Sequence, residues 1–187
     1  MKTSIANIIR PDASSYHTFF FDMATNEPLR GETHQGFSDD SSWARGQSWA
    51  VYGLALCYHY THEEAILPLF ERVTKYFIDH LPEDYVPYWD LIFSDGSCEP
   101  RDTSAAAIAA CGILEMEKYY HNQEFLDIAK KMMSSLSEKY TTVDYLQSNG
   151  IIKDGMYSRK HGHKSECTSW GDYFYLEALM RLSLIHI

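Results

Sequence analysis

The stretch of the sequence best suited to chemistry is Trp43-Ala-Arg45-Gly-Gln-Ser-Trp49. Residues four positions apart lie on one face of a helix, so a helix here would place Arg45 beside Trp49. A guanidinium group matches the two oxygens of a carboxylate, and an indole offers apolar area to the C–H face of a pyranose. These groups, with Trp43 at the edge of the same pocket, would suit an acidic sugar. The alternative is that both indoles cover a helical core while the Arg45 stem passes over it.

Loop residues upstream of this stretch supply further hydrogen-bonding groups. His34-Gln35-Gly36 places an imidazole and an amide in a flexible segment that must pass near the start of the helix, and His17 lies further upstream. Such groups suit sugar hydroxyls. Histidine and glutamine in a loop are also ordinary surface residues, so both interpretations stay open.

Two hydroxyl side chains near the other end of the chain, Ser165 and Thr168, flank Glu166 ahead of a predicted helix. Hydroxyls at a helix start can hold a carboxylate, although helix capping is the simpler explanation. His161 and His163 could ligate a metal as a pair. Because a lysine stands on either side of them, we interpret them as solvated loop residues and predict neither a metal nor a cofactor.

Helical periodicity predicts the elements that would position these groups. Residues 43–60 form a strongly apolar helix after the capping side chains of 40–42, and a second helix over 63–80 follows across a short turn. The segment 81–101 contains three prolines and an Asp-Gly turn, so we expect a loop there, with a short strand over 91–93.

A second helix pair and a single further helix follow. Asp102 or Thr103 can cap a helix over 104–120, and the next helix covers 123–139. A third pair begins with a helix over 168–179, for which Ser169 is the expected cap, with an aspartate three residues on. No partner for this last helix is evident in the sequence.

Helix pairs spaced about 60 residues apart predict a toroid or an array of helical hairpins, in which each pair buries its apolar face against a neighbour. The first forty residues are aromatic but contain no convincing helix, so we expect an inner loop system there. The final LSLIHI breaks the preceding amphipathic pattern. We therefore expect residues 1–182 to be part of one domain and 183–187 to be a truncated or non-native tail.

Composition narrows the class of protein. Hydrophobic residues make up 45% of the chain, which is enough for a core, and the formal net charge of -10 without a basic run argues against nucleic acid as a partner. No stretch approaches the roughly 20 apolar residues that cross a bilayer, and no secretory signal is evident, so we predict no membrane partner and favour the cytoplasm over the periplasm for the parent enzyme. The four cysteines are scattered, and we expect reduced core thiols.

Three long segments resemble glycoside hydrolase family 88, the unsaturated glucuronyl hydrolases. They are GETHQGFSDDSSWARGQSWAVYGLALCYHYT (31–61), EPRDTSAAAIAACGILEM (99–116) and SECTSWGDYFYLEALMRL (165–182). The segments occur in the order of the family, and the resemblance covers nearly the whole chain except the tail. It implies an all-α fold, a partial (α/α)6 barrel of which this chain supplies about half, the C-terminal half of the family domain.

The resemblance also implies a function for the parent enzyme. Members remove the terminal C4=C5 unsaturated uronic acid from oligosaccharides released by polysaccharide lyases. An aspartic acid protonates C4, water adds at C5, and the resulting hemiketal collapses to release the remaining glycan. By resemblance, the positions that bind the sugar or line the site are His17, Gln35, Arg45 and Trp49 with Trp43 near them, and Ser165 and Thr168 surround the uronate carboxylate.

The family's acid/base aspartate lies upstream of the region that this chain resembles. We therefore expect binding residues without the catalytic one, and an isolated chain that is inactive. Asp39, Asp40, Asp102 and Asp172 are expected to cap helices and fasten loops. One alternative is a related unsaturated rhamnogalacturonyl hydrolase, against which the WARGQSWAVYG segment argues. Another is a non-catalytic helical-repeat binding module, which a broad concave surface would reveal.

Overall fold

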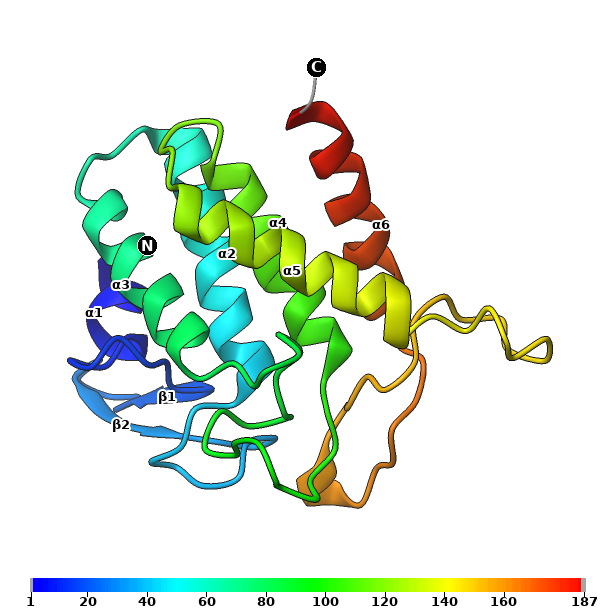
Figure 1. The fold of residues 1–187 in the computed structure, drawn as a ribbon. Helices are drawn as coiled ribbons and strands as arrows, with labels where there is room; N and C mark the ends of the chain where they lie inside the picture. Colours follow the sequence, from blue (N-terminus) through cyan, green and yellow to red (C-terminus); the bar gives the residue numbers. More distant parts are fainter. Residues whose placement is uncertain (1, 186–187) are drawn as a thin grey trace.

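The computed structural model describes residues 2–185 and is mostly helical (Figure 1). A small antiparallel hairpin of two strands lies beside the N-terminal helix. The elements are α1 (Lys2–Ile8), β1 (Thr18–Phe21), β2 (Pro28–Glu32), α2 (Ala44–Thr61), α3 (Ile66–Asp79), α4 (Thr103–Met116), α5 (Gln123–Lys139), the 3-10 turn η1 (Arg159–His161) and α6 (Ser169–Ile185).

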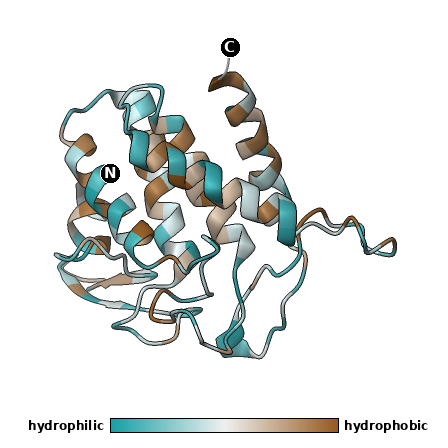
Figure 2. Cartoon of the chain, viewed as in Figure 1, coloured by the Kyte–Doolittle hydropathy of each residue, from teal (hydrophilic) through white to brown (hydrophobic). Residues whose placement is uncertain are grey.

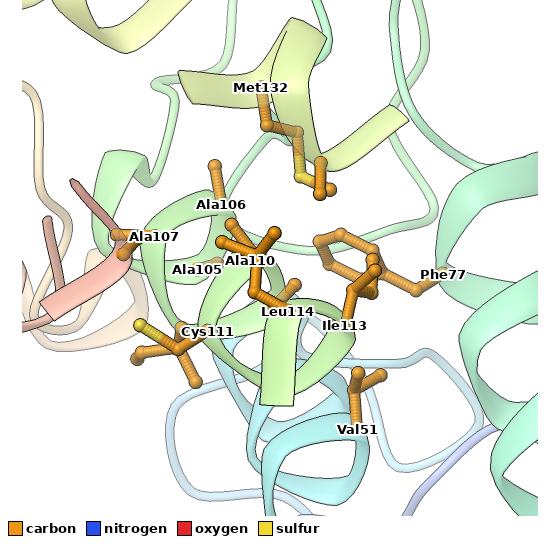
Figure 3. Packing of buried hydrophobic residues seen from close by; sticks show 14 of the residues in the cluster. Val51, Phe77, Ala105, Ala106, Ala107, Ala110, Cys111, Ile113, Leu114 and Met132 are labelled. Atoms are coloured by element: carbon orange, nitrogen blue, oxygen red, sulfur yellow. The ribbon is translucent and has the colours of Figure 1, made fainter. Parts of the chain in front are cut away.

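Three helices, α2, α4 and α6, form an inner row with α4 in the middle. Helix α3 packs against α2 and α5 against α4, so these two are the outer members of two helical hairpins. Every residue of α4 is buried, because its run of alanines lets neighbouring helices approach from several sides (Figure 3). At Gly112 an added Cβ would lie 2.8 Å from the backbone of Tyr52, so the close contact of α2 with α4 requires glycine.

The predicted helix pairs are confirmed. Helices α2 and α3 form the first pair, and α5 occupies the predicted range 123–139. Helix α4 ends at Met116 rather than at 120. In the turn that leads to α5, the Glu117 carboxylate accepts a hydrogen bond from the Asn122 backbone N–H at 3.2 Å. The strand expected over 91–93 is wrong, because the loop before α4 is held by isolated bridges of Trp43 with Asp90 and of Tyr88 with Arg101.

Three predicted helix caps are also wrong, one of them at α4, where the Asp102 side chain makes no cap hydrogen bond. At the start of α2 no side chain caps the helix, and the Ala44 N–H instead donates to the carbonyl of Trp89 at 3.1 Å. At the start of α6 the cap is Thr168, whose Oγ1 accepts from the Gly171 N–H at 3.2 Å. Asp172 faces the preceding loop and accepts hydrogen bonds from two backbone N–H groups there.

The first forty residues contain more regular structure than predicted, since α1 and the β1–β2 hairpin lie there. Both elements are short and rely on tertiary contacts. The Tyr16 ring covers Gly31 of β2 so closely that an added Cβ would come within 2.2 Å of it. At the other end, α6 continues through Ile185, so 183–185 of the expected tail extend the helix, and 186–187 lie outside the described residues.

The cysteines only partly follow expectation. All four are free thiols, but Cys111 alone is fully buried, whereas Cys98 and Cys167 are exposed. Burial raises the pKa of the Cys111 thiol, so it behaves as an apolar core residue. Among the residues that the structure describes, none of the helices combines the length and the apolar character needed to cross a bilayer.

Candidate functional site

The starts of the three inner helices lie on the same side of the molecule, facing the loops in the lower part of Figure 1. Arg45 lies in the first turn of α2, Ser104 in that of α4, and Trp170 in that of α6. Backbone N–H groups in a first helical turn lack partners within the helix, and the helix dipole adds positive potential there. The convergence therefore favours an anionic or hydroxyl-rich ligand.

Arg45 is the buried centre of this region. Its Nη1 donates to Asp102 Oδ2 at 2.6 Å, to Ser104 Oγ at 3.1 Å and to the Met156 carbonyl at 2.7 Å. Its Nη2 donates to the carbonyl of Tyr157 at 2.8 Å. Arg45 is 3% exposed and Asp102 is 0% exposed, so a protein carboxylate holds the guanidinium fork that we predicted would face a sugar.

Two indoles enclose the guanidinium. The Cζ atom of Arg45 lies 4.6 Å from the ring centroid of Trp43 and 5.2 Å from that of Trp170. Trp170 Nε1 also donates to Ser104 Oγ at 3.2 Å, which ties α6 to α4. Trp170 is a site residue that was not predicted, although a tryptophan in the first turn of a helix, two residues after Thr168, was a usable signal.

His17 and the loop after β2 form the wall beside Trp43. The His17 ring stacks on Trp43 with centroids 4.2 Å apart, and its Nδ1 accepts from the backbone N–H groups of His34 and Gln35, each at 3.2 Å. Burial, with the nearby charges of His34 and Arg45, lowers the pKa of His17 to about 4. The ring is therefore neutral near pH 7, and because Nδ1 accepts, its proton resides on Nε2.

Gln35 shares a partner with Arg45. Its Nε2 donates to the Tyr157 carbonyl at 2.8 Å, the same oxygen that accepts from Arg45 Nη2. One backbone carbonyl thus joins the loop after β2 to the start of α2. Tyr157 was not predicted from the sequence, because it takes part through its backbone carbonyl and no sequence pattern shows which carbonyl two side chains will share.

An apolar cavity of about 370 Å³ opens between α1 and α2 beside these residues. His17, Trp43 and Trp49 line it together with Ile5 and Ile8 of α1. Trp49 of α2 is 38% exposed, and its ring packs edge-on against the ring of Phe174 in α6. The cavity therefore presents aromatic faces and one neutral imidazole, which suits the apolar face of a sugar ring.

Ser165 and Thr168 lie apart from this cavity. Thr168 is buried, and its methyl group covers Gly155 while its hydroxyl caps α6. Ser165 is exposed and lines a separate cavity of about 250 Å³ with Arg159 and Lys164. The structure thus brings together His17, Gln35, Trp43, Arg45 and Trp49, but not these two hydroxyls.

Aspartates near the matched segments fasten loops, as predicted for three of them. Asp39 accepts from the Thr33 N–H at 2.8 Å, Asp102 binds Arg45, and Asp172 holds the loop before α6. A buried aspartate that the sequence analysis did not select, Asp90, accepts from the Phe37 N–H and from the Ser41 hydroxyl. Within residues 2–185, no group of three or more His, Cys, Asp or Glu side chains is placed to hold a metal ion.

Comparison with known proteins decides which family this site belongs to. The model of glycosyl hydrolase family 88 matches residues 7–183. The chain belongs to this family. Its α2, α4 and α6 helix starts are therefore those of a family 88 fold, which confirms the resemblance seen in the three sequence segments.

Several characterised relatives share this fold. An unsaturated chondroitin disaccharide hydrolase from Streptococcus pneumoniae is 50% identical over 184 residues, which cover 95% of this chain and 46% of the relative. An unsaturated glucuronyl hydrolase from Bacillus sp. (strain GL1) is 41% identical over 181 residues, covering 94% and 48%. The crystal structure of unsaturated glucuronyl hydrolase from Streptococcus agalactiae matches with a TM-score of 0.91 at 46% identity, covering 96% of this chain and 47% of that one.

This family 88 chain thus spans about half the length of the curated relatives it matches. The predicted fold class, a helical part of an α/α barrel, is confirmed by the solved structures. The pectin-directed hydrolase and the non-catalytic repeat module are not favoured by these matches.

Proposed function

We propose that this chain is the sugar-binding half of an enzyme that removes the C4=C5 unsaturated glucuronic acid from the non-reducing end of lyase-generated oligosaccharides. The observation that carries the proposal is the apolar cavity lined by His17, Trp43 and Trp49 beside the Arg45–Asp102 pair. The relatives named above act on unsaturated glucuronyl or chondroitin substrates by name, which supports the same substrate class here.

Binding of the sugar rests on the aromatic cavity. Its volume of about 370 Å³ accommodates a pyranose ring, whose C–H face would lie against Trp49. The Nε2–H of neutral His17 is a donor for a ring hydroxyl. Gln35 and Arg45 act indirectly, because both donate to the Tyr157 carbonyl and so hold the loops beside the cavity in place.

Only the family resemblance places the uronate carboxylate near Ser165 and Thr168 at the α6 start. Thr168 is buried and its Oγ1 accepts from the Gly171 N–H, so in this chain the hydroxyl caps α6. Ser165 is exposed and lies near Lys164, which adds positive charge to that edge. This assignment rests on the family resemblance of the SECTSWGD segment, since the two hydroxyls do not line the aromatic cavity.

The proposed reaction is hydration of a vinyl ether rather than direct displacement at the anomeric carbon. A carboxylic acid protonates C4, water adds its oxygen to C5 and gives up a proton to the resulting carboxylate, and collapse of the hemiketal releases the glycan. Among the described residues, no carboxyl group lines the aromatic cavity. The proton donor is therefore assigned to the part of the enzyme that this chain does not contain.

A fluorescence titration tests the binding role. An unsaturated chondroitin disaccharide should change the tryptophan emission of the chain in a saturable way, because Trp43 and Trp49 line the cavity. The matched disaccharide with a saturated uronate should bind more weakly, because its puckered ring fits a flat aromatic face less well. Equal binding of the two sugars, or of neither, would contradict the proposal. A heparin-derived unsaturated disaccharide belongs in the same series, since the crystal structure of an unsaturated glucuronyl hydrolase specific for heparin matches 99% of this chain at 30% identity.

A further inference from the structure

The loops that face the inner helix starts are hydrophilic over much of their length (Figure 2). The loop before α4 nevertheless contains a carboxylate, that of Asp90, which is 0% exposed. Among residues 2–185, no lysine, arginine or histidine forms an ion pair with it. A buried carboxylate without a counter-ion is costly unless hydrogen bonds replace its water. The groups that donate to Asp90 therefore identify the segments that it holds together.

The donors to Asp90 come from two loops. In the connection from β2 to α2, residues 33–43, the Phe37 N–H donates to Oδ2 at 2.8 Å and the Ser41 hydroxyl donates to the same oxygen at 2.7 Å. In the loop before α4, the Ile92 N–H donates to Oδ1 at 3.2 Å. Both carboxylate oxygens are thus used, and they fasten the β2–α2 connection to the loop before α4.

The backbone around Asp90 also sets the start of α2. The Leu91 N–H donates to the Ser42 carbonyl at 2.9 Å, and Asp90 itself forms an antiparallel bridge with Trp43. Trp43 carries the ring on which His17 stacks. Asp90 is therefore held in place by the same backbone that places one wall of the candidate site.

The loop that Asp90 fastens carries the two N–H groups that bind His17. The N–H groups of His34 and Gln35 both donate to Nδ1 of His17, each at 3.2 Å. The next residue, Gly36, packs directly on the carboxylate, since an added Cβ would lie 3.0 Å from Asp90 Oδ2. A shift of this loop would therefore move both donors away from the imidazole.

We propose that Asp90 is a positioning residue for His17, because it holds the loop whose two N–H groups keep the imidazole proton on Nε2. Asp90 is not among the residues that line the aromatic cavity, so it acts through this loop. A neutral imidazole released from the two donors can carry its proton on either nitrogen. The consequence for sugar binding rests on the proposed function, which gives the Nε2–H to a ring hydroxyl, whereas the state of the ring can be measured without sugar.

Nitrogen NMR of the His17 ring, recorded on this chain without sugar near pH 7, tests the role of Asp90. In the parent we expect the signals of a single neutral tautomer with its proton on Nε2. Asp90→Asn keeps the shape of the side chain but has one acceptor oxygen, and its NH2 group must face a donor. We expect the two ring-nitrogen signals of this variant to shift toward each other, because both tautomers become populated. Calorimetry should show about tenfold weaker binding of an unsaturated chondroitin disaccharide.

Asp84→Asn is the matched control. Asp84 lies in the same loop and likewise uses both oxygens, accepting from the Val86 N–H at 3.3 Å and from the Tyr140 hydroxyl at 2.7 Å. Tyr140 stands at the end of α5, so this aspartate fastens the loop to a different element. Asp84→Asn and Asp90→Asn should both lower the midpoint of urea denaturation, but only Asp90→Asn should move the His17 signals.

Ser41→Ala provides a second variant that keeps the Asp90 carboxylate and removes one of its donors. It should move the His17 signals in the same direction by a smaller amount, and it decides the question if Asp90→Asn does not fold. Unchanged His17 signals in folded Asp90→Asn, or in Ser41→Ala where that variant replaces it, would overturn the inference, as would an equal shift in Asp84→Asn. Shifted signals without any change in sugar affinity would support the positioning role and contradict the proposed sugar contact of His17.

Discussion

The two ends of the inner helices carry charge pairs of opposite design. At the site end, Arg45 and Asp102 join α2 to α4, both are buried, and backbone carbonyls occupy the other guanidinium donors. At the far end, Arg181 joins α6 to Glu115 of α4 and to Glu177, and the cluster borders an open groove. A pair surrounded by backbone acceptors is fixed in position, whereas a pair in an open groove can still rearrange.

The two ends also differ in how completely the apolar side chains are packed within this chain. Around Arg45, two indoles and the Tyr157 loop complete the packing within this chain. Around Arg181, apolar residues such as Leu176 and Met180 remain exposed. The site end is therefore expected to hold its geometry, while the side chains at the far end are expected to be more mobile.

Loss of Asp102 should have the largest effect on stability. Asp102→Ala leaves the Arg45 charge buried without a counter-ion, so we expect the free energy of unfolding to fall by about 3 to 5 kcal/mol. Urea denaturation measures it. Asp79→Ala, which removes an exposed pair with Lys75, is the control and should leave the free energy of unfolding almost unchanged. A small effect at Asp102 would show that water reaches the pair and that the comparison between the two ends fails.

Arg181→Ala should cost less than Asp102→Ala. Lys118 and His59 remain beside Glu115, and the groove admits water, so a loss of about 2 kcal/mol is expected in the same urea measurement. If Arg181→Ala equals or exceeds Asp102→Ala, the far end is as tightly built as the site end.

The two ends of α2 should differ in sugar binding. Trp49→Ala removes an aromatic wall of the cavity and should weaken binding of an unsaturated disaccharide about tenfold in a titration by calorimetry. Tyr60→Ala, at the far end of the same helix, should leave the affinity unchanged. Similar losses at both positions would mean that the sugar does not select the site end.

The smallest expected effect is the contribution of His17 to the pH dependence of the free energy of unfolding. Its pKa is about 4 in the folded chain and 6.5 in the reference state, so the unfolded state binds more protons between these values. Stability from the neutral ring is fully present above pH 6.5 and is lost as the pH falls toward 4. We expect about 1 kcal/mol, because the ring is only half-buried.

Urea denaturation of the parent and of His17→Gln at pH 7 and pH 4.5 measures this contribution, since other groups titrate equally in both proteins. His121→Gln, at an exposed position on the α4–α5 turn, is the control and should keep the pH dependence of the parent. Identical pH dependence in the His17→Gln variant and the parent would show that burial does not control the imidazole.

Periodic apolar residues made the long helices predictable, because α2, α3 and α5 each bury one face. Of the residues that the segment resemblance pointed to, His17, Gln35, Trp43, Arg45 and Trp49 lie near one another, whereas Ser165 and Thr168 lie apart from them. Short elements were missed for a physical reason. Helix α1 and the hairpin depend on contacts with distant residues rather than on their own propensity.

The partner of Arg45 could not be predicted from local sequence. Asp102 occupies the cap position of α4, and capping is what an aspartate there usually does. It turns to Arg45 instead because α2 and α4 pack closely at Gly112, which brings residues far apart in the sequence into contact. Shared acceptors such as the Tyr157 carbonyl likewise exist only in three dimensions.

The most direct test follows the ultraviolet absorbance of the C4=C5 bond in an unsaturated chondroitin disaccharide. We predict that this chain alone leaves the absorbance unchanged, and that the absorbance falls once the unmatched portion of the Streptococcus pneumoniae relative is added. Loss of absorbance with this chain alone would contradict the account. It would mean that the chain contains the catalytic acid, whereas none of the described residues that line the cavity carries a carboxyl side chain. An unchanged signal from a mixture shown to be a one-to-one complex would contradict the proposed substrate.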